Sequence, residues 1–359
     1  MATSPNYAWA EPDNSSLVKN GAQDIRALGD AIDTSVWNIG FGQAGKNKII
    51  NGDFGFWQRG TTLTYTSSGL NYLADRFFSW TIGTLNVTVS QQAFTAGTAP
   101  VAGYEGQYFL RNAVTSLSGQ SIQAVGQRIE DVRTFANQTA TFSFWAKADA
   151  SRTYTTRVVQ NFGSGGSSEV ATSAGSHSVT TSWQRFSATV AIPSVSGKTI
   201  GTSSYLMVLL DGPSNTANTL DTWGWQLEYG SKATPFETAT GTYATELAAC
   251  QRYYFRSTPS SSFGWLGSGV AQSTTVTSMA VTLPSTMRIV PTSVDFSTLS
   301  LVDGVTATAV TTCTIDSNVT SNNFGVVTAS VASGLTQYRP YYLRQNSSSA
   351  GFIGFSAEL

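Results

Sequence analysis

The sequence is poor in charged residues, and this shortage excludes two classes of partner. Only 11% of its 359 residues are charged, with 20 Lys and Arg against 21 Asp and Glu, so the formal net charge is −1. Nucleic acids and anionic membrane surfaces bind proteins mainly through basic patches, so neither is expected as a main partner. No run approaches the roughly 18 apolar residues of a membrane-spanning helix, so no membrane insertion is expected.

Histidine and cysteine are also scarce, which limits catalysis and metal binding. The single histidine, His177, and the two cysteines, Cys250 and Cys313, supply at most three nitrogen or sulfur ligands without zinc-site spacing. A Ser–His–Asp or Cys–His catalytic group would have to use His177, which we predict to be a surface-loop residue of a Gly/Ser-rich run. We interpret the cysteines as buried apolar residues rather than a disulfide.

Uncharged polar and aromatic residues take the place of the missing charge. Aromatic residues make up 12% of the chain, including 9 Trp and 19 Phe. That content, together with a net charge near zero, predicts a folded chain rather than a disordered one. The N-terminus lacks the basic, apolar and small-residue order of a signal peptide, so we expect synthesis in the cytoplasm without export by secretion.

An amphipathic helix is predicted from Val18 to a point before Gly40, with cap candidates at residues 13–16. Its apolar residues recur at alternating steps of four and three, which is the seam of a coiled coil. Fewer than three heptads are marginal in isolation, so the stripe must pack on the domain that follows or on copies of itself. We favour self-association. The stripe consists of Val18, Ala22, Ile25, Gly29, Ile32 and Val36, with Leu28 beside it.

The rest of the chain predicts a mainly β fold in two parts. Residues 47–240 alternate apolar and polar side chains between Gly/Ser/Pro turns, which is typical of a β-sandwich or jelly roll. The apolar run 205–210 predicts an inner strand buried on both faces. Residues 241–359 open with a helix-like stretch and then return to β patterns, so we predict a smaller, β-sandwich-like C-terminal domain. Residues 1–46 form the third segment, an extended arm followed by the helix.

The helix-like stretch at the start of the C-terminal segment carries two local predictions. Thr245, ahead of Glu246, is a candidate helix cap. Tyr253 and Tyr254 follow the stretch, and we expect them to pack between the two β domains.

Aromatic residues of the C-terminal segment are the candidate binding residues. Aromatic faces stack on the C–H surfaces of sugars, and neighbouring amides and hydroxyls read the sugar hydroxyls. Trp265 is either a contact at a loop tip or a plug in a core or interface. Tyr341 and Tyr342 are adjacent, so in a strand only one of them faces outward. The candidates are Phe263, Trp265, Tyr338, Tyr341, Tyr342 and Arg344.

Several motifs, in order, resemble tail fibres of tailed bacteriophages. They are the runs 6–12 (NYAWAEP), 22–29 (AQDIRALG), 47–60 (NKIINGDFGFWQRG), 72–77 (YLADRF), 223–230 (WGWQLEYG), 233–237 (ATPFE) and 246–254 (ELAACQRYY). The resemblance implies a homotrimeric virion protein that needs no signal peptide. It further implies that residues 1–40 dock on a tail, baseplate or adaptor protein, and that the C-terminal domain adsorbs to bacterial surface polysaccharide or lipopolysaccharide.

The start and end of segment 47–240 also resemble jelly-roll carbohydrate-binding modules. Those modules need no cofactor but often carry a structural calcium ion, which here implies a site near Asp53 and Glu228. The alternative is that Asp53 serves a turn and Glu228 is a solvated strand residue.

An enzyme is not expected. Glycoside hydrolysis requires two carboxylates about 5–9.5 Å apart. Glu130 and Asp131 are adjacent and flanked by arginines, and Asp211 and Asp221 are predicted turn residues. A glycan depolymerase and a purely structural baseplate or collar connector remain as alternatives to the fibre.

Overall fold

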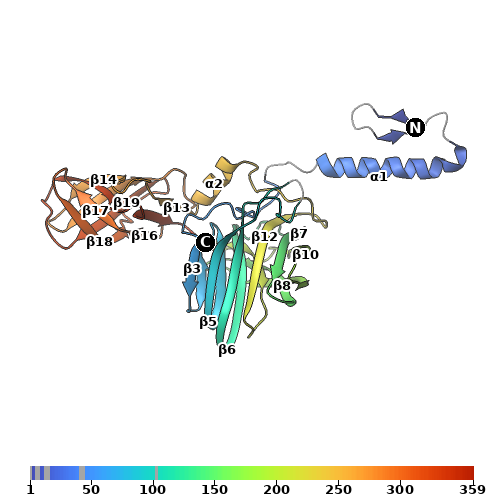
Figure 1. The fold of residues 1–359 in the computed structure, drawn as a ribbon, viewed down its shortest axis with the longest axis horizontal. Coiled ribbons are helices and arrows are strands. Elements are labelled where there is room, and N and C mark those ends of the chain that lie inside the picture. Colours follow the sequence, from blue (N-terminus) through green and yellow to red (C-terminus); the bar gives the residue numbers. More distant parts are fainter. Residues whose placement is uncertain (1, 5–8, 12–16, 40–44, 102–103) are drawn as a thin grey trace.

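The computed structural model describes residues 2–4, 9–11, 17–39, 45–101 and 104–359, while the side chains of residues 2, 3, 33–39, 84 and 116–121 fall outside the description. Along the chain, a small hairpin and a helix precede two β-rich bodies (Figure 1). No described helix has the length and apolar character needed to cross a membrane. The mainly β fold class predicted from the sequence is confirmed.

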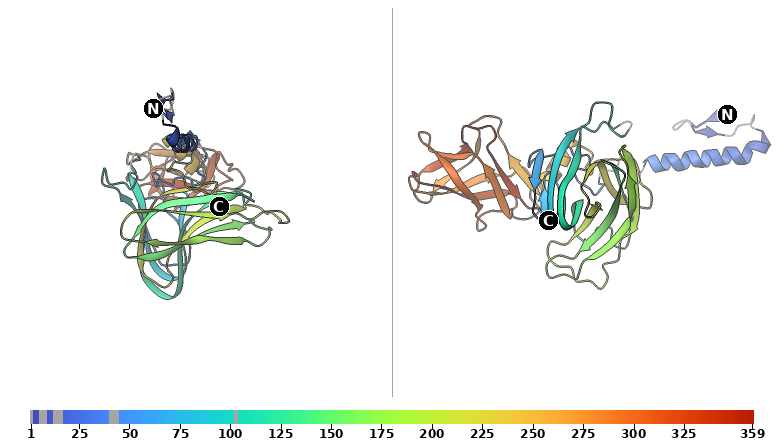
Figure 2. Two further views of the ribbon diagram at one scale, coloured as in Figure 1. Left: turned by 90° about the vertical axis from the view of Figure 1, so that its right-hand side faces the viewer. Right: turned by 60° about the horizontal axis from the view of Figure 1, so that its bottom comes forward.

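The N-terminal segment is built around one long helix. Strands β1 (Ala2–Thr3) and β2 (Ala10–Glu11) pair, and a short 3-10 turn, η1 (Val18–Asn20), leads into α1 (Gly21–Ile39). The predicted helix is confirmed over Gly21–Ile39, after a 3-10 turn where the prediction places its first residues. The predicted stop before Gly40 and Gly42 falls on residues outside the described part of the chain. The cap candidates at residues 13–16 lie outside the described residues. Figure 1 and the right-hand view of Figure 2 show α1 projecting away from the two β bodies.

The first β body is a sandwich whose two layers share long strands. The early part of β6 pairs with β12, whereas its later part pairs with β11. This change of partner carries the antiparallel sheet from one layer to the other, as in a jelly roll. The strands are β3 (Thr62–Tyr65), β4 (Gly69–Tyr72), β5 (Phe77–Ala93), β6 (Tyr108–Glu130), β7 (Thr139–Ala148), β8 (Arg152–Asn161), β9 (Val170–Val179), β10 (Gln184–Ala191), β11 (Tyr205–Asp211) and β12 (Asn218–Tyr229).

The core of the first body lies between these layers. Trp223 and Trp225 of β12 are fully buried there. The ring of Trp225 packs on Phe142 and Phe144 of β7, at centroid distances of 4.9 and 6.1 Å. Each Å² of apolar surface removed from water contributes about 25 cal/mol, so burial of these large rings stabilises the body.

Strand β11 is buried on both of its faces, as its apolar run predicts. Val208 and Leu210 belong to the main core of the sandwich. Leu209, which alternates with them, belongs to a second apolar cluster together with Phe78 and Val159. An inner strand with apolar clusters on both faces needs apolar residues at consecutive positions, which explains why the run does not alternate.

The second β body contains a closed barrel, preceded by helix α2 (Tyr243–Gln251). The barrel order is β14-β15-β19-β18-β17-β20, and β13, β21 and β16 form a small separate sheet. Closure pairs both edges of every barrel strand. The strands are β13 (Tyr254–Ser257), β14 (Trp265–Ala271), β15 (Val276–Thr282), β16 (Ser293–Ser297), β17 (Leu299–Val302), β18 (Ala307–Ile315), β19 (Phe324–Val331), β20 (Pro340–Gln345) and β21 (Phe352–Ser356).

The predicted loop position of His177 is wrong. His177 lies in β9, where its ring nitrogen bonds the Thr156 hydroxyl at 3.0 Å and its ring packs on Phe144. Partial burial lowers its pKa. The pairing of β9 with β8 draws this Gly/Ser-rich run into the sheet, and that pairing is not visible in the run itself.

The predicted turn positions of two aspartates are also wrong. Asp211 is the last residue of β11, and Asp221 lies within β12. Each is held by an arginine of a neighbouring strand, Asp211 by Arg157 and Asp221 by Arg111. These cross-strand ion pairs hold carboxylates that the local sequence assigns to turns.

The cap of α2 differs by three residues from the prediction. The cap is Thr242, whose side chain accepts a hydrogen bond from the Thr245 N–H. Thr245 is therefore the donor of the capping bond and not the cap itself.

Both cysteines are buried and free, as predicted. Burial raises the pKa of the Cys313 thiol to about 12, and burial also raises the pKa of Cys250. Neither thiol is therefore an activated nucleophile.

The chain's last residues connect the two β bodies. Glu358 forms ion pairs with Arg76 and Arg59 of the first body. The Arg76 guanidinium lies 3.3 Å from the ring centroid of Tyr253, and Arg59 lies 3.6 Å from that of Tyr254. The prediction that these two tyrosines pack between the β bodies is confirmed.

Candidate functional site

Strand alternation sorts the aromatic candidates of the C-terminal body into inner and outer residues. In β20, Tyr341 is 3% exposed and its hydroxyl accepts from the Thr336 N–H at 3.0 Å, whereas Tyr342 is 40% exposed. In β14, Leu266 is buried in the barrel core and Trp265 is 65% exposed. The sequence prediction that only one of the two adjacent tyrosines faces outward is confirmed.

Trp265 and Tyr342 form an exposed aromatic stack. Their ring centroids are 4.1 Å apart and their planes differ by 17°. β14 pairs with β20, and a bulge after Trp265 shifts the register of the pair, so that Trp265 lies opposite Arg344. Arg344 in turn covers the ring of Phe263 at 4.8 Å. Four of the six candidates therefore lie together.

The stack borders a groove on the outside of the barrel, which we call the barrel groove. Its volume is about 520 Å³, and none of the described residues that line it is charged. Three exposed aromatic rings beside hydroxyl groups suit an uncharged polar ligand with apolar faces. The lining consists of Ser257, Trp265, Leu266, Gly267, Ser268, Ala280, Val281, Thr282, Phe324 and Tyr342.

Two of the six predicted binding residues lie apart from the other four, and most residues that line the barrel groove were not predicted from the sequence. Tyr341 belongs to the core, and Tyr338 is 77% exposed on the turn before β20, outside the groove lining. Phe324 and Thr282 were missed because they join the groove only through the pairing of β15 with β19.

The carboxylates expected near a calcium ion are held by protein donors. Glu228 is buried, not solvated, and accepts bonds from the Thr234 N–H and hydroxyl at 2.8 and 2.6 Å. The ammonium of Lys46 lies 3.5 Å away. Within the described residues, no group of three or more His, Cys, Asp or Glu is placed to hold a metal ion. Calcium at Asp53 and Glu228 stays a prediction, and Lys46 argues against it.

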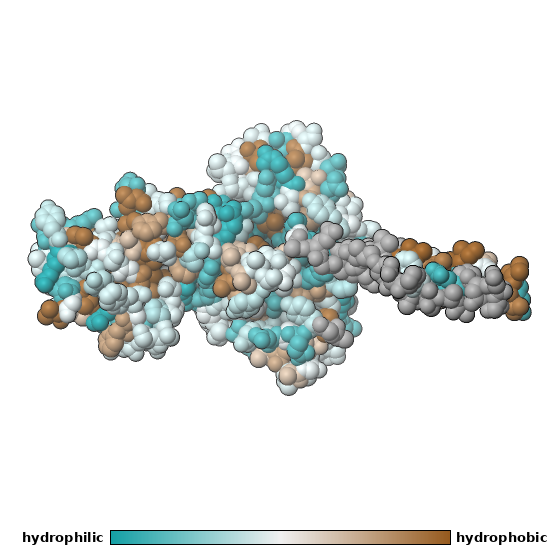
Figure 3. Space-filling view, turned by 90° about the horizontal axis from the view of Figure 1, so that it is seen from above, coloured by the Kyte–Doolittle hydropathy of each residue, from teal (hydrophilic) through white to brown (hydrophobic). Residues whose placement is uncertain are grey.

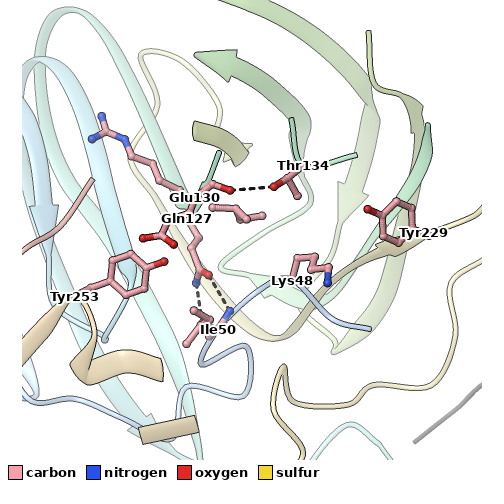
Figure 4. A pocket seen from close by; sticks show the side chains of 9 residues that line it. Lys48, Ile50, Gln127, Glu130, Thr134, Tyr229 and Tyr253 are labelled. Atoms are coloured by element: carbon pink, nitrogen blue, oxygen red, sulfur yellow. Dashed lines mark hydrogen bonds between the residues drawn. The ribbon is translucent and has the colours of Figure 1, made fainter. Parts of the chain in front are cut away.

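A pocket of about 330 Å³ lies at the end of β6 (Figure 4). The Gln127 amide bonds both the N–H and the carbonyl of Ile50 at 2.8 Å, and the Thr134 hydroxyl donates to the Glu130 carbonyl at 2.9 Å. These polar groups already bind one another, and the Gln127–Ile50 bonds join β6 to the loop that precedes the sandwich.

Comparison with known proteins identifies no family. No protein-family model and no curated protein sequence matches the chain. Among solved structures, it is similar to the enzymatically active domain of tailspike protein 4 of bacteriophage CBA120, at 12% identity and a TM-score of 0.32, over 52% of this chain and 22% of that one. It is also similar to the C-terminal family 22 carbohydrate-binding module of Clostridium thermocellum Xyn10B, at 16% identity and a TM-score of 0.32, over 54% and 99% of the two chains. At these values the matches do not decide function.

Proposed function

We propose that this chain is a homotrimeric phage tail-fibre protein that docks on the tail through residues 1–40 and binds bacterial surface glycan through the barrel groove. The observation that carries the binding role is the exposed Trp265–Tyr342 stack beside an uncharged, hydroxyl-lined groove. Exposed aromatic rings fixed by strand pairing bind at little entropic cost.

The exposed stripe of α1 supports self-association. Val18, in the preceding turn η1, is 97% exposed, and in α1 Ile25 is 66% and Ile32 38% exposed. Leu28 is half-buried, and the side chain of Val36 lies outside the described residues. Apolar residues line one edge of α1 in Figure 3. A trimer would bury this stripe and present three barrel grooves, so weak sites would act with avidity.

A binding role is favoured over glycan cleavage because the candidate carboxylates are engaged. Asp221 pairs with Arg111 at 2.6 Å, and Asp211 pairs with Arg157 at 2.8 Å. Glu130 bonds Arg252 at 3.0 Å. None of these three carboxylates is presented as a free acid or base.

Replacing Trp265 or Tyr342 by alanine tests the barrel groove. We expect each change to weaken binding to an array of bacterial surface polysaccharides by about tenfold, because one ring of the stack is lost. Tyr338→Asn is the control, since asparagine tolerates the positive φ of 64° at that turn. Equal binding by all four proteins would refute the assignment and favour a structural connector.

Light scattering tests the trimer. The full chain should have three times the mass of its 38.1 kDa monomer, and Ile25→Asp should reduce it to the mass of one. Lys19→Asp, which changes an exposed charge outside the stripe, is the control. A monomeric wild-type chain would refute the helix bundle.

A further inference from the structure

A second groove lies on the first β body, at the end nearest α2. It has a volume of about 670 Å³, and its walls come from the loop before β3, the end of β5, the segment that leads into β6 and the start of α2. We call it the sandwich groove. Its aromatic residues are Trp57, Tyr104, Tyr108 and Tyr243.

Two of the rings that line the sandwich groove are held in place by packing. Tyr104 packs on Trp223 and Phe236 at centroid distances of 5.4 and 5.2 Å. Tyr243 packs on Phe56 at 4.7 Å, yet is 73% exposed. These two walls are therefore preorganised, and a ligand would not have to order them.

Gly106 permits the loop that carries Tyr104 to approach the core closely. A Cβ at this position would lie 2.8 Å from Trp223 Nε1, nearer than side chains tolerate. The absence of a side chain at residue 106 thus sets the position of one wall of the groove.

A carboxylate also lines this groove. Asp53 Oδ2 accepts the Tyr104 hydroxyl at 2.9 Å, while the bond to Oδ1 from the Gly55 N–H is long, at 3.4 Å. This geometry leaves acceptor capacity for a ligand hydroxyl. Burial raises the pKa of Asp53. Gln91 and Gln107 add amide groups, and the described residues of the lining include neither lysine nor arginine.

We propose that the sandwich groove binds a neutral saccharide segment at a site separate from the barrel groove. Aromatic walls suit sugar C–H faces, and the carboxylate and amides suit sugar hydroxyls. Asp53 and Glu105 both line the groove and would repel the carboxylates or phosphates of acidic sugars. The inference rests on the proposed glycan-binding function and adds a second site to it.

The test measures binding of the full chain to neutral and to uronic-acid-containing bacterial polysaccharides. Tyr243→Ala should weaken binding to a neutral polysaccharide about tenfold, because one wall is lost. Alanine at the first position of a helix is well tolerated, so the fold should persist. Tyr243→Phe keeps the ring and should bind as the wild type does. Asp53→Asn, which can still accept from Tyr104, should also weaken binding.

The outcomes separate this site from the barrel groove. If Tyr243→Ala and Asp53→Asn weaken binding to the neutral polysaccharide and Trp265→Ala does not, the result supports binding in the sandwich groove and refutes binding in the barrel groove. Weaker binding by all three variants supports both sites. Unchanged binding by Tyr243→Ala overturns the present inference, and a loss in Trp265→Ala then leaves the proposed function standing. Binding of acidic polysaccharides alone also overturns the inference, and binding of none overturns both proposals.

Discussion

Replacing Glu358 by glutamine tests the contact that joins the two β bodies. Glu358 is the counter-charge of Arg76, whose side chain is 1% exposed and stacks on Tyr253. Burial by itself lowers the pKa of Arg76, but the carboxylate of Glu358 and its neighbours outweigh it and the pKa is raised. The guanidinium therefore stays charged, and Glu358→Gln leaves it buried without a full counter-charge.

The expected cost follows from the burial of the pair. Breaking a buried ion pair by removing one partner costs about 3–5 kcal/mol. We expect about 3 kcal/mol, the low end of this range, because the glutamine carbonyl can still accept a hydrogen bond from Arg76. The exposed pair of Arg133 with Asp131, also at 3.2 Å, should contribute less than about 1 kcal/mol.

Unfolding in guanidinium chloride, applied to Glu358→Gln and to the control Asp131→Asn, measures the difference in stability between the buried and the exposed pair. The reasoning predicts a clearly lower midpoint for Glu358→Gln only. The double variant Arg76→Met with Glu358→Gln should be less destabilised than the sum of its single changes, because no unpaired charge remains. Equal midpoints for Glu358→Gln and Asp131→Asn would refute the role of the buried pair.

Two further predictions concern pH dependence and reactivity. Burial raises the pKa of Asp75 from 3.8 to about 6. The folded state therefore favours the protonated carboxyl, and the stability that this contributes is fully present below about pH 4. About 3 kcal/mol of it is lost as the pH rises from about 4 through about 6. Asp75→Asn should flatten this dependence in urea unfolding, and an unchanged slope would contradict it. Iodoacetamide should label Cys250 and Cys313 only after denaturation, and rapid labelling of the folded protein would show that their burial is wrong.

Local patterns in the sequence determined the class of fold and several of its parts. The four-and-three spacing predicted α1, alternation predicted the strands, and the adjacent pair Tyr341 and Tyr342 divided into one inner and one outer ring. These features depend on neighbours a few residues apart, so the periodicity of the chain is enough to predict them.

Tertiary structure alone decided which distant residues meet. Trp265 and Tyr342 stack because β14 pairs with β20, and a bulge sets that register. Asp53 meets Tyr104 across two segments, and Glu358 meets Arg76 of the other β body. Strand register and the docking of two bodies depend on contacts between distant segments, which no local pattern encodes.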